Sequence, residues 1–257
     1  MPEGRVDYDR VAPTYNRRFD ANGQRGVTTA LRELAQALDA ESVLEVGCGT
    51  GYWLSGLKGV VDQLYGLDLS QGMLQQAQTR GAPLYLTRGR AGQVPFPDDV
   101  FDLVFCVNAI HHFDQPCAFV GEAARVLRPG GALAVVGMDP HNGRDRWYVY
   151  RYFPGTRATD LRRFPSWGTI LDWMVSAGAD RVRCRVVERI QDIKVGRAVL
   201  ADPFLEKNAA SQLALLSDEA YADGIRRIET ALARAEEQGE ALLFPSEITL
   251  GMLVGWF

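Results

Sequence analysis

The sequence has few of the features that mark a disulfide scaffold, a zinc protein or a membrane protein. It contains only four cysteines, and none form a C-x-x-C pair, so the pattern predicts scattered reduced thiols and no metal site. No apolar run approaches the roughly 20 residues that a membrane-spanning helix needs. The first residues, rich in Arg and Asp, are not typical of a signal peptide. We therefore expect a cytoplasmic protein without a membrane span.

The sequence also lacks a strong charge of either sign. A formal net charge of −4 gives no overall attraction to nucleic acid or to an anionic membrane, and we expect no nucleic-acid partner. The length and the hydrophobic content of 47% suffice for a sizeable core. We expect a single domain over residues 1–257, with an amino-terminal helical segment at 1–40 and covering segments at about 139–165 and 191–245. The oligomeric state stays open.

A glycine-rich turn follows a short apolar run early in the chain. Residues 43–51 read Val-Leu-Glu-Val-Gly-Cys-Gly-Thr-Gly, which predicts a buried strand that ends in a tight turn. Gly47, Gly49 and Gly51 would let backbone N–H groups approach a ligand closely. A dinucleotide fingerprint needs a third glycine where this chain has Tyr52. The pattern therefore disfavours NAD(P), and an ordinary tight turn remains the alternative.

Two acids lie beside this turn in the predicted sheet. Glu45 interrupts the apolar run, where a carboxylate is costly unless something pairs with it. Asp68 ends a second strand predicted within residues 63–70, and Ser70 suits the N-cap of a helix at 71–80. An acid in the position of Asp68 can accept two hydrogen bonds from a ribose diol. The alternative for Asp68 is a simple capping acid.

A pair of histidines follows the next predicted strand. Residues 95–113 contain a proline-rich turn, an apolar strand, Asn108 and then two adjacent histidines. A helix is predicted at about 115–127. The Arg-Pro-Gly-Gly sequence after it leads into another apolar strand at 132–138. The order of strands, helices and turns is typical of an α/β fold.

Taken together, these segments resemble a known family. The chain looks like a class I S-adenosylmethionine (SAM)-dependent methyltransferase of the type-11 kind, grouped with the ubiquinone and menaquinone biosynthesis methyltransferases. The matching segments are residues 8–15, 44–51, 66–70, 94–98 with 101–102, and 125–131. The resemblance implies a Rossmann-like, seven-stranded, mainly parallel sheet whose last strand is antiparallel, with helices on both faces and a helical cap insert. It also implies methyl transfer from SAM to a small molecule, with O-, N- or C-methylation unresolved.

The resemblance implies a set of cofactor contacts. Glu45 would orient the SAM ammonium, Asp68 would bind the ribose hydroxyls, and Leu69 would lie against the adenine. Asn108 would sit beside the methionine part through its backbone, and Tyr15 would close over the carboxylate with Arg18 as a charge partner. The complete predicted set is Tyr15, Arg18, Glu45, Gly47, Gly49, Gly51, Asp68, Leu69, Ala91 and Asn108.

One residue departs from the family pattern. Arg90 stands where the family usually has an acid that accepts a hydrogen bond from the adenine amino group. Because arginine has no acceptor lone pair, adenine recognition would fall to the backbone near Ala91 or to the Gln93 side chain.

The methyl acceptor is expected to contact residues after the fifth predicted strand. The segment 139–165 interleaves six arginines with aromatic residues, at the sheet edge where α/β folds place ligands. Such residues could hold a planar or anionic acceptor, and the alternative is a connector whose aromatics fill the core. An RNA acceptor is disfavoured by the overall acidity. The predicted acceptor contacts are His111, Trp147, Tyr148, Arg151 and Tyr152.

A general base, if the acceptor needs one, is predicted at His112. Adjacent residues that leave a strand tend to point to opposite sides, so we expect only one of His111 and His112 to face the cleft. The alternative is a capping or packing histidine.

The remaining chain predicts the far edge of the sheet. Residues 180–190 alternate charged and apolar side chains, as an edge strand does. Residues 247–257 are almost wholly apolar and are expected to insert beside the strand at 132–138. The helix predicted at 217–237 carries an apolar stripe that we attribute to packing against the sheet.

Two other functions remain open. A SAM-binding module without catalysis would keep the same turn and the same acid, and an NAD(P)-dependent oxidoreductase shares the strand-turn-helix unit but not Tyr52.

Overall fold

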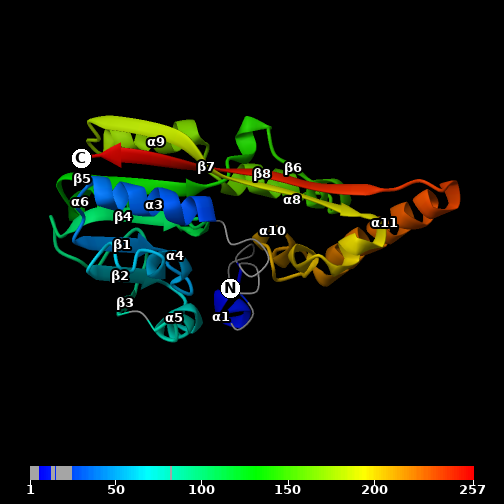
Figure 1. Ribbon diagram of the computed structural model, residues 1–257, viewed down its shortest axis with the longest axis horizontal. Helices are drawn as coiled ribbons and strands as arrows, with labels where there is room; N and C mark the ends of the chain where they lie inside the picture. Colours follow the sequence, from blue (N-terminus) through cyan, green and yellow to red (C-terminus); the bar gives the residue numbers. More distant parts are fainter. Residues whose placement is uncertain (1–5, 13–14, 16–24, 82) are drawn as a thin grey trace.

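The computed structural model of the protein describes residues 6–12, 15, 25–81 and 83–257. Its centre is an eight-stranded sheet in the order β3-β2-β1-β4-β5-β8-β6, with β7 paired to β8 (Figure 1). The strands are β1 Ser42–Val46, β2 Gln63–Asp68, β3 Leu84–Arg88, β4 Phe101–Val107, β5 Leu127–Gly137, β6 Arg146–Trp147, β7 Arg181–Val195 and β8 Leu243–Trp256. The predicted sheet had seven strands, and the additional one is the two-residue β6.

The helices surround this sheet and fill the connections between its strands. The α-helices are α1 Tyr8–Val11, α3 Arg25–Ala37, α4 Tyr52–Ser55, α5 Gln71–Gln78, α6 Pro116–Val126, α7 Tyr148–Tyr152, α8 Thr156–Arg163, α9 Trp167–Ser176, α10 Ser211–Ala214 and α11 Asp218–Gln238. The 3₁₀ turns are η1 Ile110–His112, η2 Pro140–Asn142, η3 Gly196–Ala201 and η4 Pro203–Leu205. The predicted N-cap at Ser70 is confirmed, because its Oγ accepts a hydrogen bond of 3.1 Å from Met73 N.

The first five strands run parallel, and β1, β4 and β5 among them are covered on both faces. Successive residues of β1 point to opposite sides, so Val43 packs with α3 and α4 while Leu44 packs with α6 and α9. Strand β4 divides in the same way between Phe105 and Val104. This two-sided burial explains why these strands read as continuous apolar runs.

The order of the last strands is confirmed. Strand β8 runs antiparallel between β5 and β7, with Ala132 opposite Trp256 on one side and Arg181 opposite Trp256 on the other. The inner strand is therefore apolar, and the charged β7 lies outside it, as the sequence pattern predicted.

Strands β7 and β8 continue well beyond the parallel strands and form an arm with α11 beside it (Figure 1). The insert was predicted to begin at residue 191, but β7 extends to Val195 and β8 already begins at Leu243. Burial could not mark these strand ends, because much of β7 alternates between half-buried and exposed residues. Helix α11 is confirmed, but its stripe packs on the arm rather than on the parallel sheet, with Ile228 and Leu232 in a separate core.

We call this separate core the arm core, formed by buried side chains of α7, α10, α11, β8 and the turns between them. Its buried members are Trp147, Tyr148, Val149, Tyr152, Phe153, Val199, Leu205, Ala210, Leu213, Ile228, Leu232 and Phe244. It is distinct from the two clusters that cover the faces of the parallel sheet, and Ile248 of β8 packs against both the arm core and one of those clusters. The arm thus carries its own hydrophobic support.

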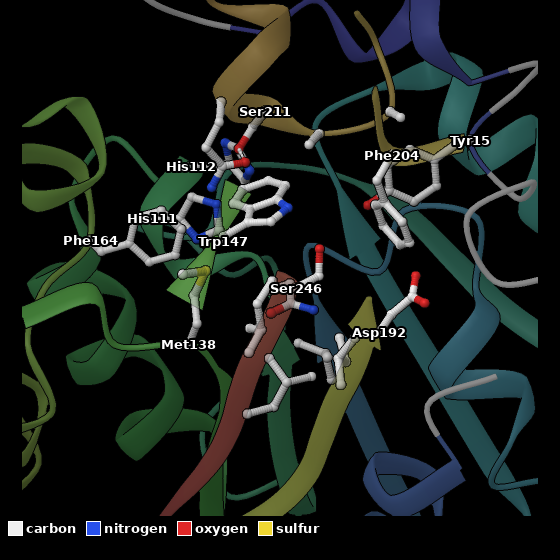
Figure 2. A pocket seen from close by; sticks show the side chains of 18 of the residues that line it. Tyr15, His111, His112, Met138, Trp147, Phe164, Asp192, Phe204, Ser211 and Ser246 are labelled. Atoms are coloured by element: carbon white, nitrogen blue, oxygen red, sulfur yellow. Dashed lines mark hydrogen bonds between the residues drawn. The ribbon is translucent and has the colours of Figure 1, made fainter. Parts of the chain in front are cut away.

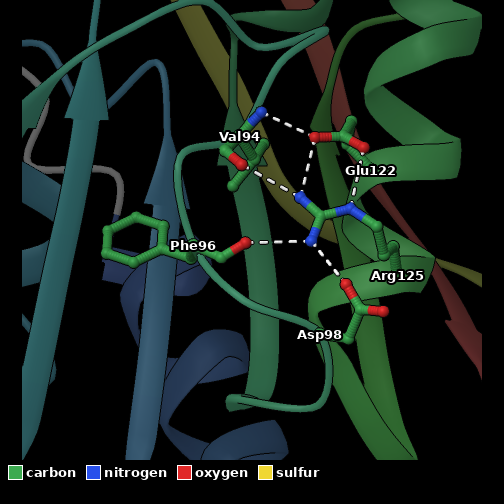
Figure 3. Close-up of polar contacts among 5 residues, drawn as sticks. All are labelled: Val94, Phe96, Asp98, Glu122 and Arg125. Atoms are coloured by element: carbon green, nitrogen blue, oxygen red, sulfur yellow. Dashed lines mark hydrogen bonds and ion pairs between the residues drawn. The ribbon is translucent and has the colours of Figure 1, made fainter.

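A guanidinium joins two of the segments that carried the family resemblance (Figure 3). Arg125 on α6 donates to the backbone oxygens of Val94 and Phe96, each at 2.9 Å, and forms an ion pair with Asp98 at 2.7 Å. Glu122 completes the arrangement by accepting from Arg125 and from Val94 N. These bonds hold the turn before β4 against α6, so this pair of motifs serves the fold.

Candidate active site

The glycine turn after β1 has the left-handed backbone that the sequence pattern requires. The φ angles of Gly47, Gly49 and Gly51 are 72°, 52° and 68°, a region that other residues rarely adopt. A Cβ on Gly47 would lie 2.7 Å from the Ala109 side chain. The amides of Gly47 and Cys48 both donate to Leu67 O, at 2.7 and 3.1 Å. The turn is thereby fastened to the end of β2.

Asp68 closes the turn from the side of β2. Its Oδ2 accepts from Gly49 N at 2.7 Å and its Oδ1 from Ser70 N at 2.8 Å. Burial raises the pKa of Asp68, although these backbone donors oppose the shift. A carboxylate has about four acceptor sites, so Asp68 retains capacity for a hydroxyl donor. Leu69 beside it is 46% exposed, an apolar surface at the mouth of the turn.

Glu45 is a buried carboxylate that is only half satisfied. Its Oε2 accepts from Leu54 N at 3.0 Å, whereas its buried Oε1 has no hydrogen-bond partner among the described residues. Burial raises the pKa of Glu45 well above its ordinary value. Because an unpaired buried acceptor is costly, this oxygen is suited to a donor that arrives with a ligand.

Two further predicted cofactor residues lie on the adjacent connections. Asn108 follows β4 with a φ of 50° and donates its N–H to Val136 O at 2.8 Å. A left-handed asparagine at the end of a central strand marks a constrained position of the kind found at functional sites. Ala91 follows β3, and its neighbour Arg90 forms an ion pair with Asp114 at 2.6 Å.

A cavity of about 140 Å³ opens beside the ends of β4 and β5 (Figure 2). Asn108 and Trp53, each from a connection next to the glycine turn, form part of its wall. The other walls come from α1, η1, the 139–165 segment, the insert and both strands of the arm. Six aromatic side chains line it: Tyr8, Tyr15, Trp53, Trp147, Phe164 and Phe204.

Both histidines line this cavity, which corrects the expectation that only one would. They lie on the 3₁₀ turn η1 rather than on an extended strand, so the alternation of sides does not apply. The His111 ring stacks on Phe164 with centroids 3.7 Å apart, and burial lowers the pKa of His111 well below its ordinary value. Nε2 of His112 lies 2.7 Å from the Tyr8 hydroxyl.

The predicted acceptor contacts in 139–165 are largely placed elsewhere. Trp147 lines the cavity, but Tyr148 and Tyr152 are buried in the arm core and Arg151 is exposed. Tyr148 donates to Asp202 at 2.9 Å, and burial beside that carboxylate raises the pKa of Tyr148. The aromatics of this segment thus mainly fill the core of the arm, which was the alternative for them.

Several cavity residues were not predicted from the sequence. Asp192, Asp202, Phe204, Gln212 and Ser246 all reach the cavity from the arm and the insert. Asp192 and Ser246 are paired across β7 and β8. Only the Asp-Pro sequence at 202–203, typical of a helix start, offered a local signal, and it pointed to a cap rather than to a ligand.

Of the remaining predictions, Tyr15 lines the cavity and Arg18 lies outside the described residues. In the described part of the chain no group of three or more His, Cys, Asp or Glu side chains is placed to hold a metal ion. Within the same ranges, no helix has both the length and the apolar character to cross a membrane.

Comparison with known proteins agrees with this geometry. A protein-family profile described as a methyltransferase domain matches residues 44–135. Malonyl-acyl-carrier-protein O-methyltransferase of Dechloromonas aromatica is 34% identical over 139 residues, which are 53% of this chain and 50% of that protein. Demethylmenaquinone methyltransferase of Tropheryma whipplei is 34% identical over 142 residues, 52% of this chain and 58% of that protein. The chain spans about half the length of these curated relatives.

A solved structure extends the similarity of fold to the whole chain. Phosphoethanolamine N-methyltransferase 2 of Haemonchus contortus, crystallised with SAM, has a TM-score of 0.61 at 16% identity, covering 100% of this chain and 61% of that one. The Rossmann-like fold implied by the sequence motifs is thus confirmed. The match to the methyltransferase-domain profile covers residues 44–135 and therefore only part of the chain.

Proposed function

We propose that the protein transfers a methyl group from SAM to a small-molecule acceptor that has a planar or apolar part. The observation that carries this proposal is the meeting of two sites at one sheet edge. The glycine turn closed by Asp68 lies at the end of β1, and the aromatic cavity begins at Asn108, which follows the adjacent β4. Ligands of open α/β sheets bind at this edge.

The glycine turn is the SAM site in this proposal. Asp68 accepts hydrogen bonds from the ribose, and the exposed side chain of Leu69 covers one face of the adenine. The unpaired Oε1 of Glu45 receives the SAM ammonium, directly or through a water molecule. Tyr15 and Asn108 stand on the cavity side of the turn, where the methionine part and its methyl group would point.

The cavity is the acceptor site. Rings such as Trp147, Phe164 and Phe204 offer flat apolar walls, and Asp192 and Gln212 offer polar groups among them. SAM supplies an activated methyl group when it is bound. The protein then needs to align the acceptor and exclude water, and such alignment contributes roughly 7–11 kcal/mol in well-oriented systems.

Calorimetry with S-adenosylhomocysteine (SAH) tests the cofactor assignment. We expect micromolar binding of SAH, and Asp68→Ala should weaken it at least tenfold, about 1.4 kcal/mol. The loss would combine the ribose contact with the two backbone bonds that shape the turn. Asp62→Ala is the matched control, because Asp62 lies on the exposed loop before β2.

The same calorimetry can contradict the cofactor assignment. Binding of NAD without binding of SAH would overturn the proposed function, since both ligands need a glycine turn and an acid after the second strand. Equal losses for Asp68→Ala and Asp62→Ala would remove Asp68 from the cofactor site.

A further inference from the structure

A chain of polar contacts leads from the cavity wall into the protein interior. The Tyr8 hydroxyl lies 2.7 Å from His112 Nε2, and Arg163 Nη2 lies 3.4 Å from His112 Nδ1. Behind them, Arg163 Nη1 is 3.7 Å from Asp160 Oδ1. Tyr8 and His112 line the cavity, whereas Asp160 is fully buried and the Arg163 side chain is only 16% exposed.

Asp160 is anchored through its other oxygen, whereas Asp160 Oδ1 and Arg163 Nη1, the two atoms of the inner ion pair, are buried without a hydrogen-bond partner among the described residues. Asp160 Oδ2 accepts from Tyr150 Oη and from Gln212 Nε2, both at 2.8 Å. Arg163 Nη2 also contacts Ser211 Oγ at 3.3 Å. Burying two charges is costly, and apolar side chains of similar volume often stabilise a fold as well or better. A role beyond packing would therefore explain the pair.

The Arg163 guanidinium, 3.4 Å from Nδ1, favours one tautomer of a neutral His112. Arginine has donors and no acceptor, so Nδ1 must turn a lone pair toward Arg163. The neutral ring then carries its proton on Nε2, the atom that faces Tyr8. A second proton on Nδ1 would place an N–H against the guanidinium. The adjacent ring of His111, whose centroid is 4.0 Å from that of His112, also disfavours protonation of His112 to the charged form.

We propose that Arg163 and Asp160 are positioning residues that hold His112 in the Nε2–H tautomer, and that Tyr8 rather than His112 takes the proton of the methyl acceptor. The tautomer stands on the contacts alone, and the proton transfer rests on the proposed function. The assignment replaces His112 as the predicted general base with a residue from α1.

The electrostatics favour a phenolate at Tyr8. A hydrogen bond from Nε2–H stabilises the charged form of the phenol, and so does the nearby Arg163 guanidinium, which interacts electrostatically with Tyr8. Tyr15 lies beside Tyr8, and His111 and Arg163 lie beside His112; the carboxylates of Asp192 and Asp202 line the same cavity and oppose a negative charge there. The hydrogen bond and the guanidinium should nevertheless lower the pKa of Tyr8 below the ordinary value of about 10.

The transfer step balances with these groups. The bond between the acceptor atom and the methyl carbon forms as the S–CH₃ bond breaks, and sulfur keeps that electron pair. The acceptor keeps the electrons of its bond to hydrogen, and the proton goes to the Tyr8 phenolate oxygen. The products are SAH, the methylated acceptor and a neutral tyrosine, which then loses its proton to solvent.

Nitrogen-15 NMR of histidine-labelled protein, with SAH added, tests the tautomer. The chain has three histidines, and His112→Gln assigns the signal. We expect an unprotonated Nδ1 and a protonated Nε2 at neutral pH. Arg163→Met should replace this by a mixture of tautomers. Arg162→Met is the matched control, since Arg162 is the exposed neighbour on α8 and contacts only Thr159 in the described part of the chain.

Carbon-13 NMR of ring-labelled tyrosine tests the consequence for Tyr8, with Tyr8→Phe for assignment. We expect Tyr8 to titrate at least one pH unit below about 10. His112→Ala and Arg163→Met should remove the shift, and His112→Gln should retain it because the amide still donates. The wild-type spectra decide the proposal even where a variant does not fold.

A protonated Nδ1 in the wild type, or a Tyr8 titration at or above the ordinary value, would overturn the proposal. The same holds if Arg162→Met acts like Arg163→Met. Calorimetry on the same samples separates the two claims. SAH binding together with the wrong tautomer removes this inference alone, whereas absence of SAH binding removes the proposed function and leaves the tautomer measurable.

Discussion

The two halves of the candidate active site are built in different ways. The centre of the cofactor half comes from one continuous stretch, in which β1, the glycine turn and the end of β2 hold one another through hydrogen bonds, and Tyr15 and Asn108 join it from other segments. The acceptor half gathers side chains from α1, η1, β6, η4, α10, β7 and β8. Local geometry therefore defines the first half, and the packing of distant segments defines the second.

The two halves also rest on different cores. The cofactor half lies on the parallel sheet, whose two faces are covered by separate apolar clusters. The acceptor half packs against the arm core, where Tyr148, Phe153 and Phe244 are buried. Under the proposed function, changes in the arm would alter the acceptor site while the cofactor turn stays the same. Mutations should then separate the halves, except where one element serves both.

Strand β8 is that shared element, and its loss should have the largest effect. Removing residues 252–257 deletes the pairing partners of both β5 and β7 and several buried side chains of the main core. We expect no soluble protein, as judged by the soluble fraction after expression. Burial of β8 between two strands gives the reason, because its removal leaves the apolar strand β5 and the charged strand β7 each with an unpaired edge. A soluble truncated protein that still binds SAH would show that the cofactor half folds alone.

The same division explains what the sequence could predict. The turn at Gly47, the acid at Asp68 and the cap at Ser70 were found because each depends on residues nearby in the chain. Asp192 and Asp202 were missed because nothing local marks them, and only the folding of the arm brings them to the cavity.

The misplaced residues follow the same physical logic. Aromatic side chains suit a ligand wall and a protein core equally well, so the composition around Tyr148 and Tyr152 could not decide between them. The alternation of sides failed at His111 and His112 because a 3₁₀ turn replaces the strand.

An added methyl group on α11 should disturb the acceptor half alone, with an intermediate effect. A Cβ on Gly224 would lie 2.1 Å from the ring of Phe153, which is fully buried in the arm core. Gly224→Ala should therefore lower stability by about 1–3 kcal/mol through overpacking, despite the better helix propensity of alanine. We expect a lower Tm by several degrees and an SAH affinity that changes less than twofold in calorimetry.

Gly121→Ala is the matched control for this substitution. Gly121 is also a helical glycine, on α6, and a Cβ there would meet nothing within 4 Å. Alanine should raise the Tm slightly there, in line with a propensity gain of up to about 1 kcal/mol. A loss of SAH binding in Gly224→Ala alone would contradict the separation of the two halves.

Glu45→Gln removes the charge of this side chain and should alter the cofactor half alone. Its effect on stability should be the smallest of the three changes, and it should appear mainly in how the Tm depends on pH. The folded pKa of Glu45 is raised well above its ordinary value. The protonated Glu45 carboxyl therefore contributes its full stabilisation when the pH is below its pKa in the unfolded chain, about 4.3. This stabilisation is lost as the pH rises through the pKa of Glu45 in the folded protein. Glu45→Gln has no such titration. The difference in Tm between Glu45→Gln and the wild type should therefore shift in favour of the variant as pH rises through this window. Thermal unfolding at a series of pH values measures this difference.

The control and the ligand sharpen this last test. Glu33→Gln should show little pH dependence relative to the wild type, because Glu33 is an exposed partner of Arg185. Saturating SAH should flatten the wild-type profile, since a ligand ammonium beside Oε1 would favour the charged carboxylate that burial disfavours. Flattening in the wild type but not in Glu45→Gln would place the ammonium at Glu45. A profile that SAH leaves unchanged would separate Glu45 from the cofactor and make its burial a feature of the fold alone.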